Sequence, residues 1–132
     1  MVFYLARHPN RLNAPHPIII ENLLEMVHNN QQPSINSLII MLQDLYSNGR
    51  NSRYLEKFKT LPFYELKTRS RGGQKGGARV YLFLTNNDEA IIVNAEIKTG
   101  NAPNPQKLEE VAIVLRAYRL GIAVVLKRNN HE

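Results

Sequence analysis

The sequence predicts an α+β domain in which a small antiparallel sheet is packed on one face by two N-terminal helices and one C-terminal helix. Three patterns indicate this class. Apolar residues recur at helical spacing in the first third of the chain, the period becomes two from residue 62 to residue 98, and helical spacing returns after residue 104. With 132 residues and 43% apolar content, the chain has the size of one domain, residues 1–132, with one core.

The N-terminal part predicts one short strand and then two helices. The opening MVFYLAR is β-prone and aromatic, and the proline-punctuated run HPNRLNAPHP ends it near Arg7. The two amphipathic patterns that follow consist of Ile20, Leu23, Leu24 and Val27, and of Ile35, Leu38, Ile39, Leu42, Leu45 and Tyr46. Pro33 suits the first turn of the second helix, and Asn48-Gly49 predicts its left-handed end. Residues 29–32, between the two patterns, are long enough only for a helical hairpin.

The central segment predicts three strands of an antiparallel meander. The runs FYELKTR, ARVYLFL and EAIIVNAEIK have period two, and the turn-forming runs SRGGQKGG and TNND separate them. With the second hairpin centred on Asn86-Asn87, the opposed pairs on the core face are Val80 with Val93 and Leu82 with Ile91. The outer face then gathers the polar side chains of Lys67, Arg69, Arg79, Tyr81, Asn94, Glu96 and Lys98.

A third helix is predicted after residue 104. Asn104 is the expected N-cap and Pro105 the first helical residue, and Gly121 is the expected stop. The apolar positions between them are Leu108, Val111, Ala112, Leu115 and Tyr118. The remaining run IAVVLK, residues 122–127, is short and β-branched, which favours a last strand.

Positive charge is concentrated in residues 50–79. This segment holds nine basic and two acidic residues, a net charge of +7, whereas the eight basic and nine acidic residues elsewhere give −1. Aromatic residues interleave with the charges, which indicates a surface for polyphosphate and makes nucleic acid the expected partner. Besides the cations on the predicted outer face, the expected nucleic-acid-binding residues are Arg50, Arg53, Lys57, Lys59, Arg71 and Lys75.

Composition excludes several other classes of function. The chain has no cysteine and only four scattered histidines, so the sequence predicts no disulfide, no thiolate zinc site and no cofactor. No apolar run approaches the roughly 18 residues of a membrane span, and the N-terminus lacks the order of a signal peptide. The expected location is therefore the cytoplasm, without a membrane partner.

Four short motifs follow one another within roughly residues 37 to 118: Leu61, Glu65-Leu66-Lys67, Arg79-Val80-Tyr81 and Lys98-Thr99. Their order and spacing resemble the RelE/HigB superfamily of type II toxin–antitoxin toxins, particularly its phage-derived HigB-like branch. That branch shows a Leu-x-x-x-x-Glu-Leu-Arg strand, a basic Gly-containing turn, an Arg-Val-Tyr-like strand and an apolar strand ending in Lys-Lys-Thr. The sequence departs from this pattern at Glu96, where an aromatic residue is usual, and at Thr99, where the second Lys is usual.

The resemblance implies a RelE/ParE-like fold and a ribosome-dependent mRNA endonuclease that a cognate antitoxin neutralises. The partners that the resemblance implies are mRNA, the ribosome and that antitoxin, and the implied cleavage needs no metal. RNA carries its own nucleophile, so fixed cations could stabilise the charge on phosphorus while Lys, Arg or Tyr moves protons. Motif correspondence and the shared outer face together give the expected catalytic residues, which are Lys67, Arg69, Arg79, Tyr81 and Lys98.

Two further functions stay open at the level of sequence. One is a non-catalytic nucleic-acid-binding module, or a gyrase-directed inhibitor with the same fold. The other is a metal-dependent restriction-type nuclease that uses Glu96-Ile97-Lys98. A second acidic ligand would then be Asp88, about 26 Å away along an extended strand, or Asp44, which the second helix would have to bring in.

Overall fold

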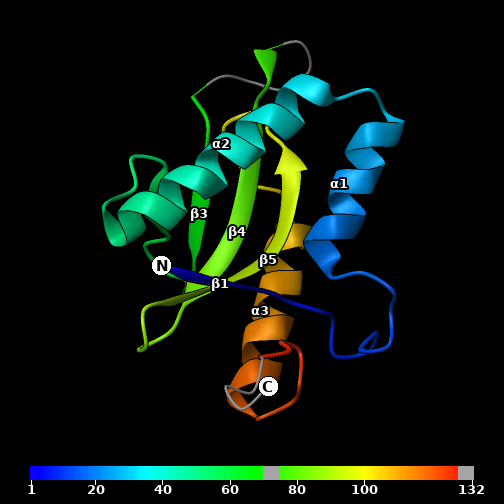
Figure 1. Cartoon of the computed structure of the whole chain (residues 1–132), viewed down its shortest axis with the longest axis vertical. Coiled ribbons are helices and arrows are strands. Elements are labelled where there is room, and N and C mark those ends of the chain that lie inside the picture. Colours follow the sequence, from blue (N-terminus) through cyan, green and yellow to red (C-terminus); the bar gives the residue numbers. More distant parts are fainter. Residues whose placement is uncertain (70–74, 128–132) are drawn as a thin grey trace.

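The structure, a computed structural model, describes residues 1–69 and 75–127, which form a five-stranded sheet and three helices (Figure 1). The strands are β1 (Val2–Leu5), β2 (Leu55–Lys57), β3 (Tyr64–Lys67), β4 (Ala78–Leu84) and β5 (Glu89–Ile97). They lie in the order β1-β5-β4-β3-β2. The α+β class and the meander of β3, β4 and β5 are confirmed. The sheet is mixed rather than antiparallel, however, because β1 pairs with β5 in parallel.

The helices are α1 (Ile18–His28), α2 (Gln32–Asn48) and α3 (Pro105–Arg119), and a 3₁₀ turn, η1 (Gly49–Asn51), follows α2. Their ends carry the predicted signals. Pro33 lies in the first turn of α2, and Gly49 ends that helix with a φ of 55°. The Asn104 side chain caps α3 by accepting a hydrogen bond from the Gln106 N–H at 2.9 Å, and Gly121 follows the helix with a φ of 83°. In the described part of the chain, no helix is long and apolar enough to cross a membrane.

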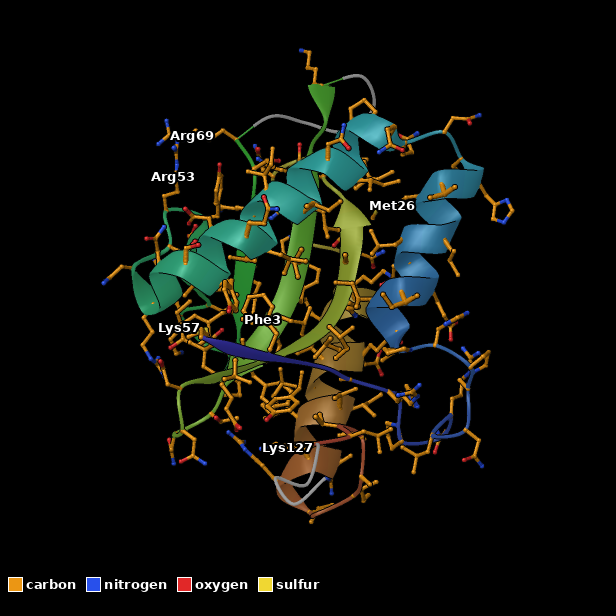
Figure 2. The ribbon with its side chains drawn as sticks, viewed as in Figure 1. Phe3, Met26, Arg53, Lys57, Arg69 and Lys127 are labelled. Atoms are coloured by element: carbon orange, nitrogen blue, oxygen red, sulfur yellow. The ribbon has the colours of Figure 1, made fainter. Side chains whose placement is uncertain are left out.

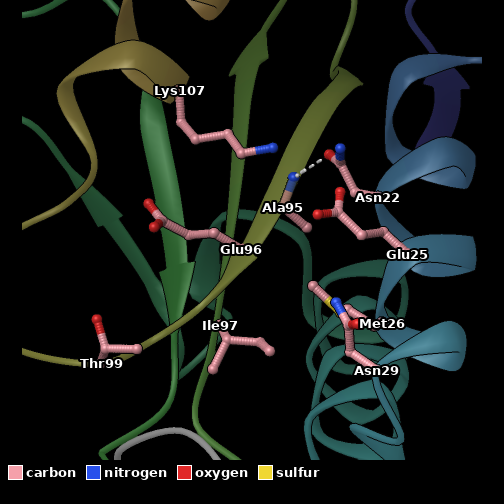
Figure 3. Close-up of a pocket in the computed structure, with 9 residues that line it drawn as sticks. All are labelled: Asn22, Glu25, Met26, Asn29, Ala95, Glu96, Ile97, Thr99 and Lys107. Atoms are coloured by element: carbon pink, nitrogen blue, oxygen red, sulfur yellow. Dashed lines mark hydrogen bonds between the residues drawn. The ribbon is translucent and has the colours of Figure 1, made fainter.

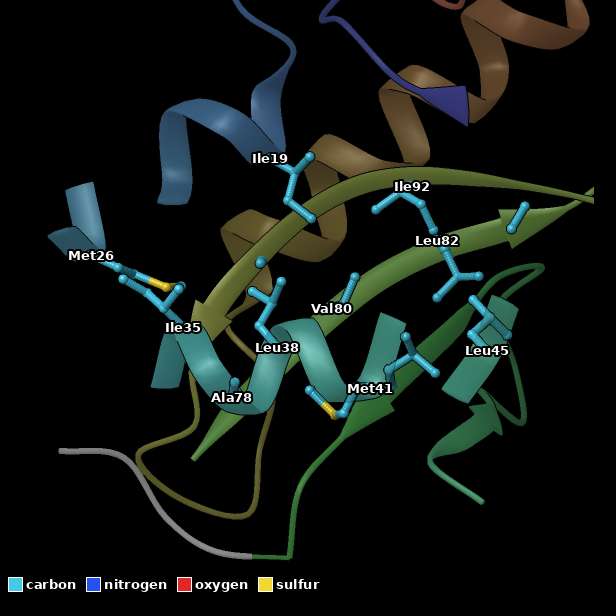
Figure 4. Packing of buried hydrophobic residues seen from close by; sticks show 13 residues of the cluster. Ile19, Met26, Ile35, Leu38, Met41, Leu45, Ala78, Val80, Leu82 and Ile92 are labelled. Carbon is cyan, nitrogen blue, oxygen red and sulfur yellow. The ribbon is translucent and has the colours of Figure 1, made fainter. Parts of the chain in front are cut away.

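The helices cover both faces of the sheet, so the predicted packing on one face is wrong. In Figure 1, α1 and α2 lie in front of the sheet and α3 lies behind it. The core under α1 and α2 includes Ile19, Met26, Ile35, Leu38, Met41, Leu45, Val80, Leu82 and Ile92 (Figure 4). The core under α3 includes Tyr81, Phe83, Ile91, Val93, Val111, Val114 and Leu115. Because β4 is apolar on both faces, it needs a helical layer on each.

The pairing of β4 with β5 also differs from the predicted register. Val80 lies opposite Ala95 and Leu82 opposite Ile92, with a register shift between Tyr81 and Leu82. Two local features cause the difference. The turn is longer than expected, since Asp88 adopts a φ of 60°, and the shift adds one residue to β5.

The extra residue in β5 changes which side chains face α3. Ile91 and Val93 belong to the α3-side core, and beyond the shift Asn94 and Glu96 also point to that side. The Asn94 side-chain amide donates to Glu110 of α3 at 2.7 Å. The predicted polar outer face therefore exists at one end of the sheet, but α3 and the segment before it cover much of it.

The last predicted strand does not form as a strand in the described residues. The segment at 122–127 makes a single antiparallel bridge between Ala6 and Val125, supported by a 2.7 Å hydrogen bond from the Arg7 N–H to the Val124 C=O. The β-branched run thus lies beside the end of β1 without extending the sheet.

Candidate nucleic-acid interface

A groove lies between β2 and the end of β3, on the side of the sheet away from β1. Its volume is about 620 Å³. Its lining residues, here called the basic groove, are Arg53, Tyr54, Leu55, Glu56, Lys67, Thr68, Arg69 and Lys98. Four cations thus converge on one groove with a single carboxylate in its lining. Figure 2 shows Arg53 and Arg69 extending from this edge of the molecule.

Backbone pairing brings the groove residues together from three separate segments. The β2–β3 ladder is extended by a 3.3 Å hydrogen bond from the Lys67 N–H to the Tyr54 C=O. Lys98 follows β5, and its Nζ donates to the C=O groups of Thr68 at 2.8 Å and Arg69 at 3.4 Å. Lys98 is buried, so it contributes positive charge from the floor of the groove, whereas Arg69 is exposed.

Lys67 lies between two carboxylates. Its Nζ is 3.1 Å from Glu56 and 3.6 Å from Glu65. These two glutamates are direct cross-strand partners in the β2–β3 ladder, an arrangement that repels unless a cation stands between them. Glu56 is 60% exposed and Glu65 only 7%, so a ligand anion can replace Glu56 at Lys67 far more easily than it can replace Glu65.

Arg79, one of the expected catalytic residues, is buried instead of lining the groove. Its side chain is 2% exposed and donates to Glu65 at 2.9 Å and to the Gly100 C=O at 2.9 Å. Glu65, Arg79 and Tyr81, which are buried, and Glu96, which is half-buried, are here called the buried polar network. Removing one partner of such a buried pair typically costs about 3–5 kcal/mol, because the other charge stays without compensation. The position of Arg79 fits a structural role.

Tyr81 belongs to the same network and is fully buried. Its hydroxyl donates to a Glu96 carboxylate oxygen, which also accepts from the Asn104 N–H at 3.0 Å. Burial, and then the hydrogen bond to Glu96, raise the pKa of Tyr81 well above its ordinary value. Burial has the largest effect on this pKa, so Tyr81 acts as a neutral hydrogen-bond donor.

The carboxylates considered for a metal site lie in separate places. Glu96 is bound by Tyr81 and Asn104, as described above. Asp88, in the turn at the far end of β5, forms a 3.6 Å ion pair with Arg50. Asp44 accepts hydrogen bonds from Ser52 and from the backbone at residue 53. Across residues 1–69 and 75–127, no group of three or more His, Cys, Asp or Glu side chains could hold a metal ion.

The other residues expected to bind nucleic acid spread around the molecule. Arg53 lines the basic groove. Arg50 pairs with Asp88, and the Lys57 Nζ donates to the C=O groups of its own loop at residues 58 and 61, both at 3.1 Å. Lys59 and Lys75 are exposed and do not line the groove. Arg71 lies outside the described residues.

Four groove residues were missing from the expected site: Tyr54, Leu55, Glu56 and Thr68. The first three belong to the segment around β2, which the strand prediction did not include. The run RYLEKF at residues 53–58 does not alternate polar and apolar side chains, so a period of two gave no signal for β2.

A second, smaller pocket of about 280 Å³ lies between α1 and β5 (Figure 3). Its lining mixes charges, with Glu25 and Glu96 alongside Lys107. The Asn22 side chain there accepts a hydrogen bond from the Ala95 N–H at 2.9 Å. Because two carboxylates and one ammonium group line this pocket, it suits a polyanion less well than the basic groove does.

When the chain is compared with known proteins, no family model, no curated protein and no solved structure matches it.

Proposed function

We propose that this chain is an RNA-cleaving toxin of the RelE/HigB type, which acts on mRNA at the ribosome without a metal and is held in check by a cognate antitoxin. The observation that carries the proposal is the basic groove, where four cations converge although the chain outside residues 50–79 is almost neutral. The motif order from Leu61 to Thr99 supports the type of toxin.

In this proposal the groove cations act on the phosphate. Water takes the proton of the RNA 2′-hydroxyl as this oxygen attacks the adjacent phosphorus, and water supplies a proton to the 5′-oxygen of the next nucleotide as its bond to phosphorus breaks. Lys67 and Arg69 stabilise the extra negative charge that develops on phosphorus, with Lys98 adding to the positive field from the floor of the groove. Arg79 and Tyr81 serve as positioning residues, since their polar groups are already bound to Glu65, Gly100 and Glu96.

The direct test is message cleavage in a translating extract, with the new RNA ends identified chemically. Attack by the 2′-hydroxyl leaves a 5′-hydroxyl on one fragment and a 2′,3′-cyclic or 3′-phosphate on the other. Arg69→Ala is expected to remove cleavage, because it deletes an exposed groove cation without touching the core. Arg116→Ala, an exposed cation on α3, is the charge-matched control and is expected to cleave normally.

Other outcomes distinguish the alternatives. Fragments with 5′-phosphate ends that depend on Glu96 would support the metal-dependent nuclease and contradict the proposal. In cells, expression is expected to arrest growth, and the antitoxin encoded beside the gene is expected to relieve the arrest. Growth arrest with intact mRNA and inhibited DNA supercoiling would instead support a gyrase-directed inhibitor.

A non-catalytic RNA-binding module is the second candidate, and the state of Tyr81 favours it. This phenol is buried and its pKa is raised, so it is poorly suited to exchange protons with a substrate. The module would show RNA binding that weakens steeply with salt while the message stays intact.

A further inference from the structure

Arg53 and Tyr54 form a cation–π pair within the basic groove. The guanidinium carbon of Arg53 lies 5.3 Å from the centre of the Tyr54 ring. This distance is inside the range of about 6 Å over which an aromatic ring attracts a cation. Arg53 is exposed and Tyr54 is half-buried, so the outer side of the guanidinium faces solvent in the groove.

The pair is held in position by α2 and by the core. One carboxylate oxygen of Asp44 in α2 accepts hydrogen bonds from the Ser52 hydroxyl at 2.5 Å and from the Arg53 N–H at 3.2 Å. The Tyr54 N–H donates to the same Ser52 hydroxyl oxygen at 3.3 Å, and the Tyr54 side chain packs on the core under α1 and α2. A ligand therefore meets a side-chain pair whose backbone is already ordered, which lowers the entropic cost of binding.

The pair shares its groove with the phosphate-binding cations. Lys67 and Arg69 line the same groove, and Figure 2 shows Arg53 and Arg69 extending from the same edge. A volume of about 620 Å³ falls in the range of about 300–1,000 Å³ that encloses a drug-sized ligand. The groove thus has room for a short stretch of one strand, with bases and phosphates contacting different side chains.

We infer that the Arg53–Tyr54 pair is a stacking platform for an unpaired base, and that the basic groove therefore selects single-stranded RNA over duplex RNA. The inference rests on the proposed RNA-binding function. Arginine guanidinium planes and aromatic rings are the groups on which proteins stack splayed-out bases. A base inside a duplex has its faces covered by its neighbours, so it cannot use such a platform.

The test compares two substitutions that both conserve charge, Arg53→Lys and Arg69→Lys. Fluorescence anisotropy measures binding of a short single-stranded RNA and of its duplex, and 2-aminopurine in the single strand reports stacking. The wild type is expected to prefer the single strand. Arg53→Lys is expected to lower single-strand affinity about tenfold, because the planar guanidinium on which the base stacks is lost.

Further readouts separate stacking from charge. Arg53→Lys should keep the salt dependence of the wild type, because the number of cations is unchanged. Arg53→Lys should also lose the quenching of 2-aminopurine fluorescence that stacking causes. Arg69→Lys should keep this quenching, and its affinity for the single strand should fall less than about threefold. Arg116→Lys, which conserves charge at an exposed position of α3 outside the groove, is the control and is expected to behave like the wild type.

Four results would overturn the inference. If Arg53→Lys binds both RNA forms as the wild type does, or if the wild type prefers the duplex, the stacking platform is wrong while RNA binding stands. Equal losses in Arg53→Lys and Arg69→Lys would likewise make Arg53 an ordinary phosphate contact. A wild type that binds neither RNA would overturn this inference together with the proposed function.

Discussion

The buried polar network and the basic groove lie next to each other on β3 and contain the same kinds of side chain, yet their burial gives them different roles. In the network, the Arg79 side chain is 2% exposed and donates hydrogen bonds to Glu65 and to the Gly100 C=O. In the groove, Arg69 is exposed and Lys67 is 35% exposed. Glu65 joins the two regions, since it binds both Arg79 and Lys67. The comparison indicates that Arg79, which is buried and paired with a carboxylate, stabilises the fold, whereas exposed Arg69 is available to a ligand.

The largest expected effect comes from Arg79→Met, which removes the main partner of a buried carboxylate. We expect the free energy of unfolding to fall by about 3–5 kcal/mol, measured by urea denaturation. The double variant Glu65→Gln with Arg79→Met should recover part of this loss, because it leaves no buried charge. If Arg79→Met keeps its stability and loses RNA cleavage, Arg79 belongs with the groove and the comparison is wrong.

Tyr81→Phe should have a smaller effect on stability and none on RNA affinity. The substitution removes one hydrogen-bond donor from Glu96, which still accepts from the Asn104 N–H. We therefore expect the free energy of unfolding to fall by about 1 kcal/mol and the Tm by about 4 °C. RNA affinity measured in parallel should equal that of the wild type. A loss of affinity at unchanged Tm would instead place the Tyr81 hydroxyl in contact with RNA.

The raised pKa of Tyr81 adds a pH dependence to the same comparison. The folded state keeps the phenol protonated at a pH where the unfolded state has lost the proton, so the unfolded state binds fewer protons. The free energy of unfolding should therefore decrease as the pH rises above about 10, the ordinary pKa of tyrosine. Tyr81→Phe should show a shallower decrease when urea midpoints are compared at neutral and alkaline pH.

Glu56→Gln tests the groove side of the comparison and should strengthen binding. Glu56 holds Lys67 at 3.1 Å from an exposed position, so it competes with an RNA phosphate for that ammonium. We expect single-stranded RNA to bind about threefold more tightly at low salt, with the gain shrinking as salt rises. Glu109→Gln, an exposed carboxylate on α3, is the charge-matched control. An equal gain in both variants would point to the overall field of the protein rather than to competition at Lys67.

The smallest expected effect is at Asp44, which positions the Arg53–Tyr54 segment. The Ser52 hydroxyl, aided by Asn48 and the Arg53 backbone, lowers the pKa of this carboxyl in the folded state. The unfolded state then binds more protons near the ordinary pKa, so this stabilisation is present above about pH 4 and is lost as the pH falls further. Asp44→Asn should slightly lower the urea midpoint near neutral pH and match the wild type more closely in acid. An unchanged difference across this range would mean that another group carries the acid dependence.

The sequence predicted the elements well where local signals set them. Pro33, Gly49 and Asn104 act within one turn of the chain, through a fixed φ, a left-handed φ and a side-chain cap, so their roles could be read directly. The period-two runs likewise gave the β3-β4-β5 meander. The layer arrangement was wrong because alternation shows which residues share a face but does not show which face a helix will cover.

For the candidate site, the sequence by itself determined the charge concentration in residues 50–79 and the shared face of Lys67 and Arg79. Only the tertiary structure decided that Lys67, Arg69 and Lys98 meet Arg53 in a groove, while Arg79 and Tyr81 are buried in a polar network. The physical reason is that burial depends on what packs above a side chain. That covering comes from α3 and the segment before it, and the one-residue shift in β5 that turns Glu96 toward Tyr81 has no local signal in the sequence.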